Sequence, residues 1–212
     1  MEVTKANIGG RVIAIKAAIA LKGQVDWLIS LLHDMHSQGS ALSDGQRLQL
    51  GFSVLTARQG MDGEISLWEP DFDRNPFEDL REGVNVTMAL LAQQTGFVRR
   101  ARAQPTGISF QDKIVLTRGA LQAGSIYLER SAPDPGKQDS GWFIGLRGND
   151  SCEELEAIFA FQLLHQRPTL LAVLALPPGF MVFVEGEEIV GVANERNEPV
   201  NMYLAPDAAG LS

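Results

Sequence analysis

Cysteine, long apolar runs and export signals are scarce or missing in this chain of 212 residues. A lone Cys152 cannot form a disulfide within the chain, which is consistent with a reducing compartment. No apolar run reaches the ~18 residues that a membrane-spanning helix requires. Met1 leads directly into polar residues, unlike the start of a secretory signal. We therefore expect a cytoplasmic protein without a membrane segment.

Histidine is also scarce, and the familiar catalytic constellations are missing. His33 and His36 have no third metal ligand nearby, so we interpret them as histidines at the edge of a helix face. Ser140 does not lie in a Gly-x-Ser-x-Gly elbow, and the glycines beside Arg147 lack the continuation of a phosphate-binding loop. We expect no catalytic residue, no cofactor and no metal ion, and hence a protein that is not an enzyme.

Positive charge is scarce in the second half of the chain. Residues 1–115 contain 13 acidic and 12 basic residues, whereas residues 116–212 contain 13 and 6, which gives net charges of −1 and −7. An acidic surface repels the phosphates of nucleic acids and favours basic partners. We expect no binding of nucleic acid, although such acidity is equally typical of proteins that only need solubility.

Length and composition predict two small domains. Hydrophobic residues make up 45% of the chain, an ordinary value for proteins with buried cores. A basic stretch followed by Pro105 and Gly107 marks a change in composition, so we place the domains at 1–104 and 113–212. The expected fold class is α+β, in which each domain has a short antiparallel sheet packed against helices.

In the first domain, residues 24–36 predict a helix with one apolar face. That face comprises Trp27, Leu28, Leu31, Leu32 and Met35. Residues 48–57 and 64–68 predict a β-hairpin across a glycine-containing turn. The Asn75-Pro76-Phe77-Glu78 segment predicts the start of a helix that ends near Gly96. Residues 11–21 fit a strand and a helix equally well.

In the second domain, strands are expected before a helix and a final hairpin. The predicted strands are 113–117, 125–130 and 142–146, and the hairpin pairs 180–184 with 189–193. The Asp150-Ser151-Cys152-Glu153 segment has the spacing of a capping box, so we expect a helix from there to Arg167. A shorter helix is expected at 169–175.

Alternating carboxylates occur beside aromatic residues in the first domain. Glu69, Asp71 and Asp73 flank Phe72 in this segment. Three interpretations stay open: a site for a divalent cation, a solvated loop, or an acidic surface that binds a basic partner. The segment lacks the glycine and the closing glutamate of an EF-hand.

The segment Asp139-Ser140-Gly141-Trp142-Phe143 stands between a strand that ends at Arg130 and the turn at 148–151. In this order, from about Lys113 to Pro199, the chain resembles the immunity-protein domains encoded beside bacterial polymorphic toxins. As a whole it looks like the immunity partner of a type VI secretion effector with a nuclease domain. The resemblance implies a cytoplasmic protein that binds its cognate toxin tightly and blocks its activity.

Acidic and aromatic residues are the candidates for contact with such a toxin. Nucleases carry basic surfaces, and aromatic anchors strengthen protein interfaces. The candidate partner-binding residues are Glu69, Asp71, Phe72, Asp73, Asp139, Trp142, Asp150, Glu153, Glu154 and Glu156. Two other functions stay open: an effector adaptor or chaperone that binds without inhibiting, and a domain that binds a small ligand or a metal ion.

Overall fold

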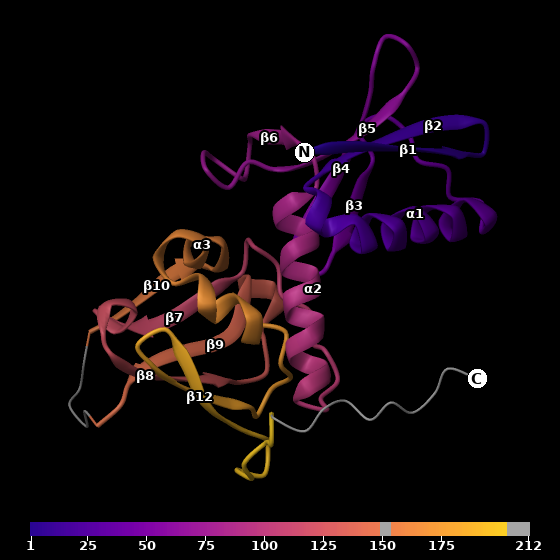
Figure 1. The fold of residues 1–212 in the computed structure, drawn as a ribbon. Coiled ribbons are helices and arrows are strands. Elements are labelled where there is room, and N and C mark those ends of the chain that lie inside the picture. The colour runs from indigo at the N-terminus through magenta and orange to yellow at the C-terminus, as the bar shows by residue number, and fades with distance from the viewer. Residues whose placement is uncertain (149–153, 203–212) are drawn as a thin grey trace, which may run out of the picture. The chain divides into compact units, whose positions relative to one another are not determined.

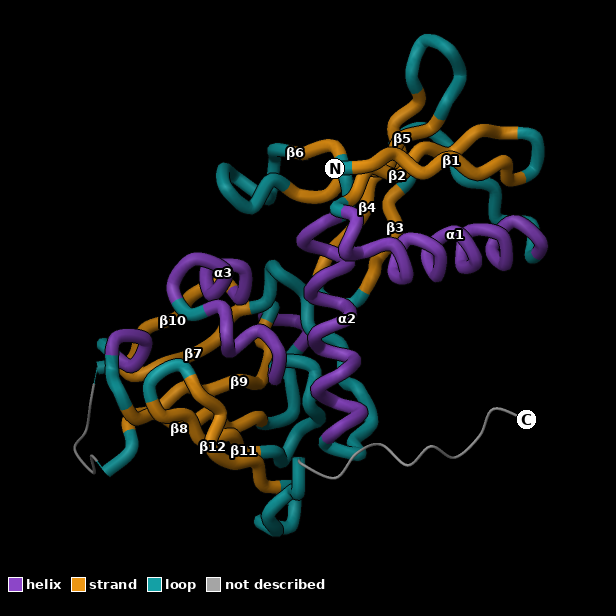
Figure 2. Tube along the Cα trace, viewed as in Figure 1, coloured by secondary structure: helices purple, strands orange, loops and turns teal. Residues whose placement is uncertain are grey.

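The computed structural model describes residues 1–148 and 154–202 (Figures 1 and 2). The chain divides into two compact units, Met1–Ala92 and Gln93–Ser212. Each unit has one six-stranded sheet with helices, so the α+β class with two small domains is confirmed. Most strand pairs are antiparallel, but each sheet also contains one parallel pair and is therefore mixed. Within the described ranges, no helix has the length and apolar character needed to cross a membrane.

In the first unit the strand order is β1-β2-β5-β4-β3, with β6 also paired to β5. The strands are β1 (Glu2–Ile8), β2 (Arg11–Ala17), β3 (Arg47–Leu50), β4 (Ser53–Gln59), β5 (Ile65–Pro70) and β6 (Leu80–Glu82). A 3-10 helix, η1 (Ile19–Leu21), leads into helix α1 (Lys22–Ser37). The hairpin predicted across the glycine-containing turn is confirmed as β4 and β5. Its first strand, predicted over 48–57, is divided, because residues 47–50 form β3 and pair antiparallel with β4.

One face of this sheet and one stripe of α1 form the core of the first unit. Ile13 and Ile15 are buried in β2, so the segment that fitted either structure is a strand as far as Ala17, and a 3-10 helix, η1, follows it. The predicted helix is confirmed, but Trp27 is 48% exposed. The buried stripe centres on Leu28 and Leu32, and Trp27 lies roughly 100° around the helix from Leu28.

The helix predicted to start at Asn75-Pro76-Phe77-Glu78 begins instead at Asn85. The Asn75 side chain accepts a hydrogen bond from the Phe77 backbone N at 3.2 Å, which closes a local turn. The residues that follow pair with β5 as strand β6. Helix α2 then runs over Asn85–Arg100, so its start lies farther along the chain than the capping pattern predicted.

In the second unit the strand order is β10-β7-β9-β8-β11-β12. The strands are β7 (Lys113–Thr117), β8 (Ser125–Arg130), β9 (Asp139–Leu146), β10 (Leu155–Phe159), β11 (Met181–Glu185) and β12 (Glu188–Ala193). The helical segments are η2 (Ala120–Gln122), η3 (Pro135–Lys137), η4 (Ala160–Gln162), α3 (Leu163–Gln166) and η5 (Pro168–Val173). The three predicted strands and the final hairpin are confirmed.

The long helix predicted up to Arg167 is wrong for its first part. Residues 155–159 form β10, which pairs antiparallel with β7 along its whole length. Their apolar residues satisfied a helical spacing, but pairing with a neighbouring strand overrides such a short local pattern. Helical structure starts only at Ala160. The predicted capping segment, residues 150–153, lies outside the described residues.

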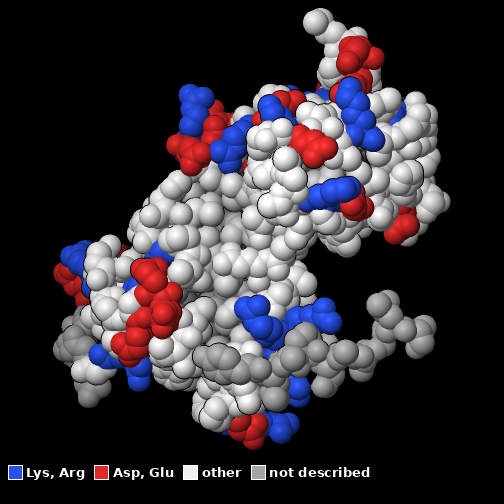
Figure 3. All heavy atoms as spheres, in the orientation of Figure 1, with Lys and Arg blue, Asp and Glu red and all other residues white. Residues whose placement is uncertain are grey.

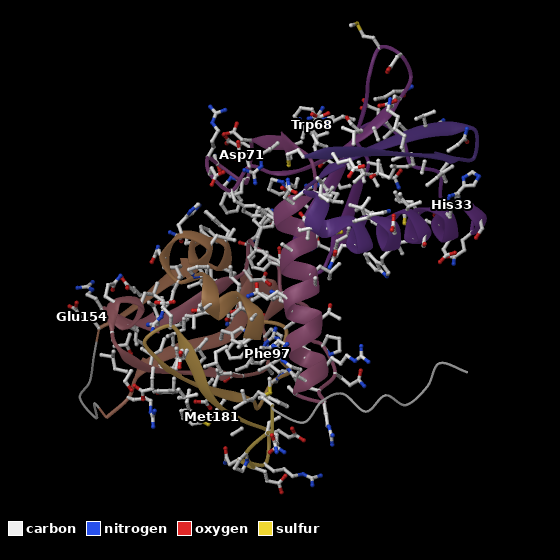
Figure 4. The ribbon with its side chains drawn as sticks, in the orientation of Figure 1. His33, Trp68, Asp71, Phe97, Glu154 and Met181 are labelled. Carbon is white, nitrogen blue, oxygen red and sulfur yellow. The ribbon has the colours of Figure 1, made fainter. Side chains whose placement is uncertain are left out.

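The second half of α2 belongs to the second unit. Gln94 donates a hydrogen bond from its side-chain nitrogen to the Leu171 carbonyl at 3.0 Å, and both Phe97 and Val98 are buried. Figure 4 shows Phe97 on the side of α2 nearest the strands of this unit. The division between the units falls inside α2, whereas the change in sequence composition falls after it, at 104–113.

We predict that the second unit needs this half-helix. A fragment of residues 85–202 should be more stable to urea than a fragment of residues 105–202, by about 3 kcal/mol or more, because the shorter one lacks the buried Phe97 and Val98. Urea unfolding followed by circular dichroism measures the difference. Equal unfolding midpoints would instead place the start of the folding unit at the composition change.

Candidate functional site

Glu69, the first of the alternating carboxylates, is buried at the start of α2. It is 0% exposed, and it accepts hydrogen bonds from the backbone N of Val86 at 3.2 Å and of Thr87 at 2.8 Å. The carboxylate thus satisfies free N–H groups of the first helical turn and faces the positive end of the helix dipole. Burial raises the pKa of Glu69, and the two backbone hydrogen bonds oppose that rise.

The other residues of this segment are organised around an arginine. The Arg81 guanidinium lies 2.7 Å from Asp73, 3.5 Å from Glu69 and 3.9 Å from Asp71, measured to the nearest carboxylate oxygens. Phe72 is buried against Phe52, with ring centroids 6.4 Å apart. The described residues contain no group of three or more His, Cys, Asp or Glu side chains placed to hold a metal ion. The cation that these carboxylates surround is Arg81.

The Asp-Ser-Gly-Trp segment forms a tight structure at the start of β9. The Asp139 carboxylate accepts a hydrogen bond from the Gly141 backbone N at 2.9 Å. The Ser140 hydroxyl donates to the Lys113 carbonyl at 2.6 Å and accepts from the Trp142 backbone N at 3.1 Å. Gly141 has a φ of +76°, and a Cβ there would collide with the Ser131 carbonyl. The hydrogen bonds of the Ser140 hydroxyl thus join β9 to β7.

Trp142 and Arg130 extend this structure into the core. Trp142 is 1% exposed and donates its indole N–H to the Leu174 carbonyl at 3.0 Å. Arg130 is equally buried, with its guanidinium carbon 5.6 Å from the centre of the Trp142 ring. It donates to five backbone carbonyls, those of Thr106, Gly107, Ser140, Leu174 and Leu176. Burial lowers the pKa of Arg130 to about 10, so the side chain stays charged at neutral pH.

The remaining predicted contact residues belong to different structural elements. Glu154 and Glu156 are exposed near the edge strand β10, and Glu154 forms an ion pair with Arg118. Figure 4 labels Glu154 in the second unit and Asp71 in the first. Asp150 and Glu153 lie outside the described residues. Glu69, Phe72 and Trp142 are buried, whereas the other described members are at least partly exposed: Asp71 and Asp73 in the first unit, and Asp139, Glu154 and Glu156 in the second.

The sheet of the second unit has a partly exposed face that the motif search missed. Side chains of β8 alternate, so that Ile126 and Leu128 are buried while Tyr127 is half-buried and Glu129 is exposed. The same alternation holds in β7, β9 and β11. We call the side that points away from the core the aromatic face; its residues are Val115, Tyr127, Glu129, Phe143, Met181 and Phe183. The alternation within the predicted strands is the sequence signal that could have revealed it.

Strand pairing makes these side chains neighbours. Glu129 lies opposite Phe143 of β9 on one side and opposite Met181 of β11 on the other. Tyr127 lies opposite Phe183 of β11, and the rings of Tyr127 and Phe143 are 6.0 Å apart. Val115 of β7 lies opposite Phe143 in turn, so the face is a continuous patch across four adjacent strands.

Glycines stand opposite two of the rings, and the one opposite Tyr127 is required for its ring to lie flat on the sheet. Gly145 stands opposite Tyr127, and a Cβ on Gly145 would collide with the tyrosine ring. Gly191 stands opposite Phe183, and a Cβ there would lie 3.4 Å from that ring. A glycine across from an aromatic residue lets the ring cover the bare backbone. The aromatic face is therefore built by the sheet itself.

After position 115, the accessible charge is more acidic than the residue count indicates. Two of the six basic residues after position 115, Arg130 and Arg167, are buried. The Arg167 guanidinium donates to the carbonyls of Ala120, Leu121, Ala123 and Gly186. Figure 3 shows acidic and basic side chains scattered over the visible surface, with wide uncharged areas between them.

Residues 93–195 match the family model of the Imm33-like domain, an immunity-protein family. The match starts where the second compact unit starts. It includes the Asp139–Trp142 segment, both buried arginines and the aromatic face. No curated protein and no solved structure matches the chain.

We predict that Arg130→Met destabilises the second unit by about 3 kcal/mol, because buried carbonyls lose their donor. Urea unfolding measures the change. Arg118→Met removes an exposed cation whose ion pair with Glu154 is solvated, and it should cost less than about 1 kcal/mol. If the two variants lose the same free energy of unfolding, the buried hydrogen bonds of Arg130 stabilise the unit no more than an exposed ion pair does.

We predict a pH-dependent effect at Glu69. Its pKa is raised on folding, so the folded state binds more protons between the unfolded and folded pKa values. The free energy of unfolding of the wild type should therefore fall as pH rises through that window. Glu69→Gln lacks this loss, so its stability relative to wild type should improve from about pH 4 to pH 7. Urea unfolding across this range measures it, with the exposed Glu78→Gln as control; parallel curves for all three proteins would contradict the prediction.

Proposed function

We propose that this chain is an immunity protein that binds a cognate toxin in the cytoplasm and neutralises it by direct contact. The observation that carries the proposal is the match of residues 93–195 to the Imm33-like domain, an immunity-protein family. Neutralisation by contact needs a surface and no chemical step. The proposal accordingly assigns the protein no catalytic residue and no cofactor.

The finer part of the proposal is that the toxin is a nuclease delivered by a type VI secretion system. Two observations support a basic partner of this kind. The Asp139–Phe143 segment resembles the immunity partners of such effectors, and residues 116–212 have a net charge of −7. Nucleases bind phosphates with basic surfaces, and opposite charge accelerates the association of two proteins.

Among the residues predicted to contact the toxin, the structure favours those with accessible carboxylates. Asp73, Glu154 and Glu156 are exposed, and Asp71 and Asp139 are half-buried. We propose these five as charges that guide the encounter. Because exposed charges at an interface rim affect association rate more than affinity, tight binding also needs a less solvated contact.

Co-expression with the toxin encoded by the adjacent gene tests the proposal. We expect the chain to restore growth, to elute with the toxin on gel filtration, and to inhibit the purified toxin. An immunity protein for an unrelated toxin is the control, and it should do none of these. Failure to bind would refute the proposal, whereas binding with full toxin activity would identify an adaptor or chaperone instead.

A further inference from the structure

We propose that the aromatic face is the toxin-binding surface of the second unit, and that it receives an arginine side chain of the toxin between Glu129 and Phe143. This inference rests on the proposed function and adds to it a location and the chemistry of the partner.

Glu129 is an acidic residue in a mostly apolar setting. Its strand neighbours are Phe143 and Met181, and the ring of Tyr127 lies beside that of Phe143. The carboxylate is exposed, and no ion pair with it forms within the described part of the chain. Nothing in the fold explains its position, because the side chain points away from the core. A carboxylate so placed is available to a cation from another molecule.

The same sheet already contains the complete arrangement. The guanidinium of Arg147 lies 5.3 Å from the centre of the Phe183 ring and 2.7 Å from a carboxylate oxygen of Glu185. A ring, a carboxylate and an arginine therefore come together at one end of the aromatic face. Glu129 with Phe143 supplies the ring and the carboxylate again, on the next strands, without the arginine.

An arginine fits this position better than other groups. Its planar guanidinium can stack on an aromatic ring while it donates two hydrogen bonds to a carboxylate, as a lysine ammonium cannot. Its aliphatic part would contact Met181, which is half-buried on the same face (Figure 4). Tyrosine, tryptophan and arginine are also the residues most often found at the centres of protein interfaces. The partner is thus expected to present an arginine surrounded by apolar side chains.

Binding of purified protein to an inactivated form of the adjacent-gene toxin tests the inference. Glu129→Gln should raise the dissociation constant roughly tenfold or more, and Phe143→Leu should raise it roughly fivefold. Glu188→Gln removes the same charge from the exposed first residue of β12 and should change the dissociation constant less than about twofold. The unfolding midpoints of Glu129→Gln and the wild type should agree, since Glu129 is exposed.

A charge-reversal pair identifies the partner group. Glu129→Arg should abolish binding, and replacing the contacting toxin arginine by glutamate should restore it. Restoration only from a lysine position of the toxin would overturn the assignment of an arginine.

The outcomes separate this inference from the proposed function. If the wild type binds and Glu129→Gln and Phe143→Leu bind as tightly, the aromatic face is not the docking surface and the proposed function stands. If the wild type does not bind the toxin, the proposed function itself is wrong. If the protein alone forms a dimer that Glu129→Gln dissociates, the face is occupied by a second copy of the chain, and the inference is overturned.

Discussion

The second unit depends on the buried guanidinium of Arg130. Its hydrogen bonds go to backbone carbonyls from three segments: the loop after α2, β9, and the chain after η5. A buried charge is tolerated only when polar groups surround it, so these three segments must meet at Arg130 for the unit to fold. Trp142 and Ser140 are fixed in the same place, which gives the Asp-Ser-Gly-Trp segment a structural rather than a catalytic explanation.

The side chains that form the core lie on one face of this sheet, so the side chains on the other face are accessible to a partner. In β8, Arg130 and Leu128 point inward while Glu129 and Tyr127 point outward. Residues adjacent in sequence thus have separate roles, one in stability and one in the proposed recognition of the toxin. This separation allows the aromatic face to change with its partner while the core stays the same, which suits a protein that must match one particular toxin.

Local patterns in the sequence predicted the strands and α1, because alternation and helical periodicity are properties of neighbouring residues. They failed where distant segments decide the structure. Residues 155–159 form a strand because they pair with β7. Glu69 is buried because its carboxylate binds the backbone N–H groups at the start of α2. The predicted site had the same weakness: acidity and aromaticity were read from the sequence, but burial of Phe72 and Trp142 comes from tertiary packing.

The use of arginine in the core also shapes the surface. Arg130 and Arg167 satisfy backbone carbonyls that would otherwise be buried without donors. Arg167 also lies 3.9 Å from the exposed carboxylate of Glu187. Arg147 remains outside, but Glu185 already neutralises it. Acidic residues outnumber basic ones after position 115, and among the residues that the structure describes no ion pair involves Glu129. The acidity of residues 116–212 is thus in keeping with the basic partner proposed above.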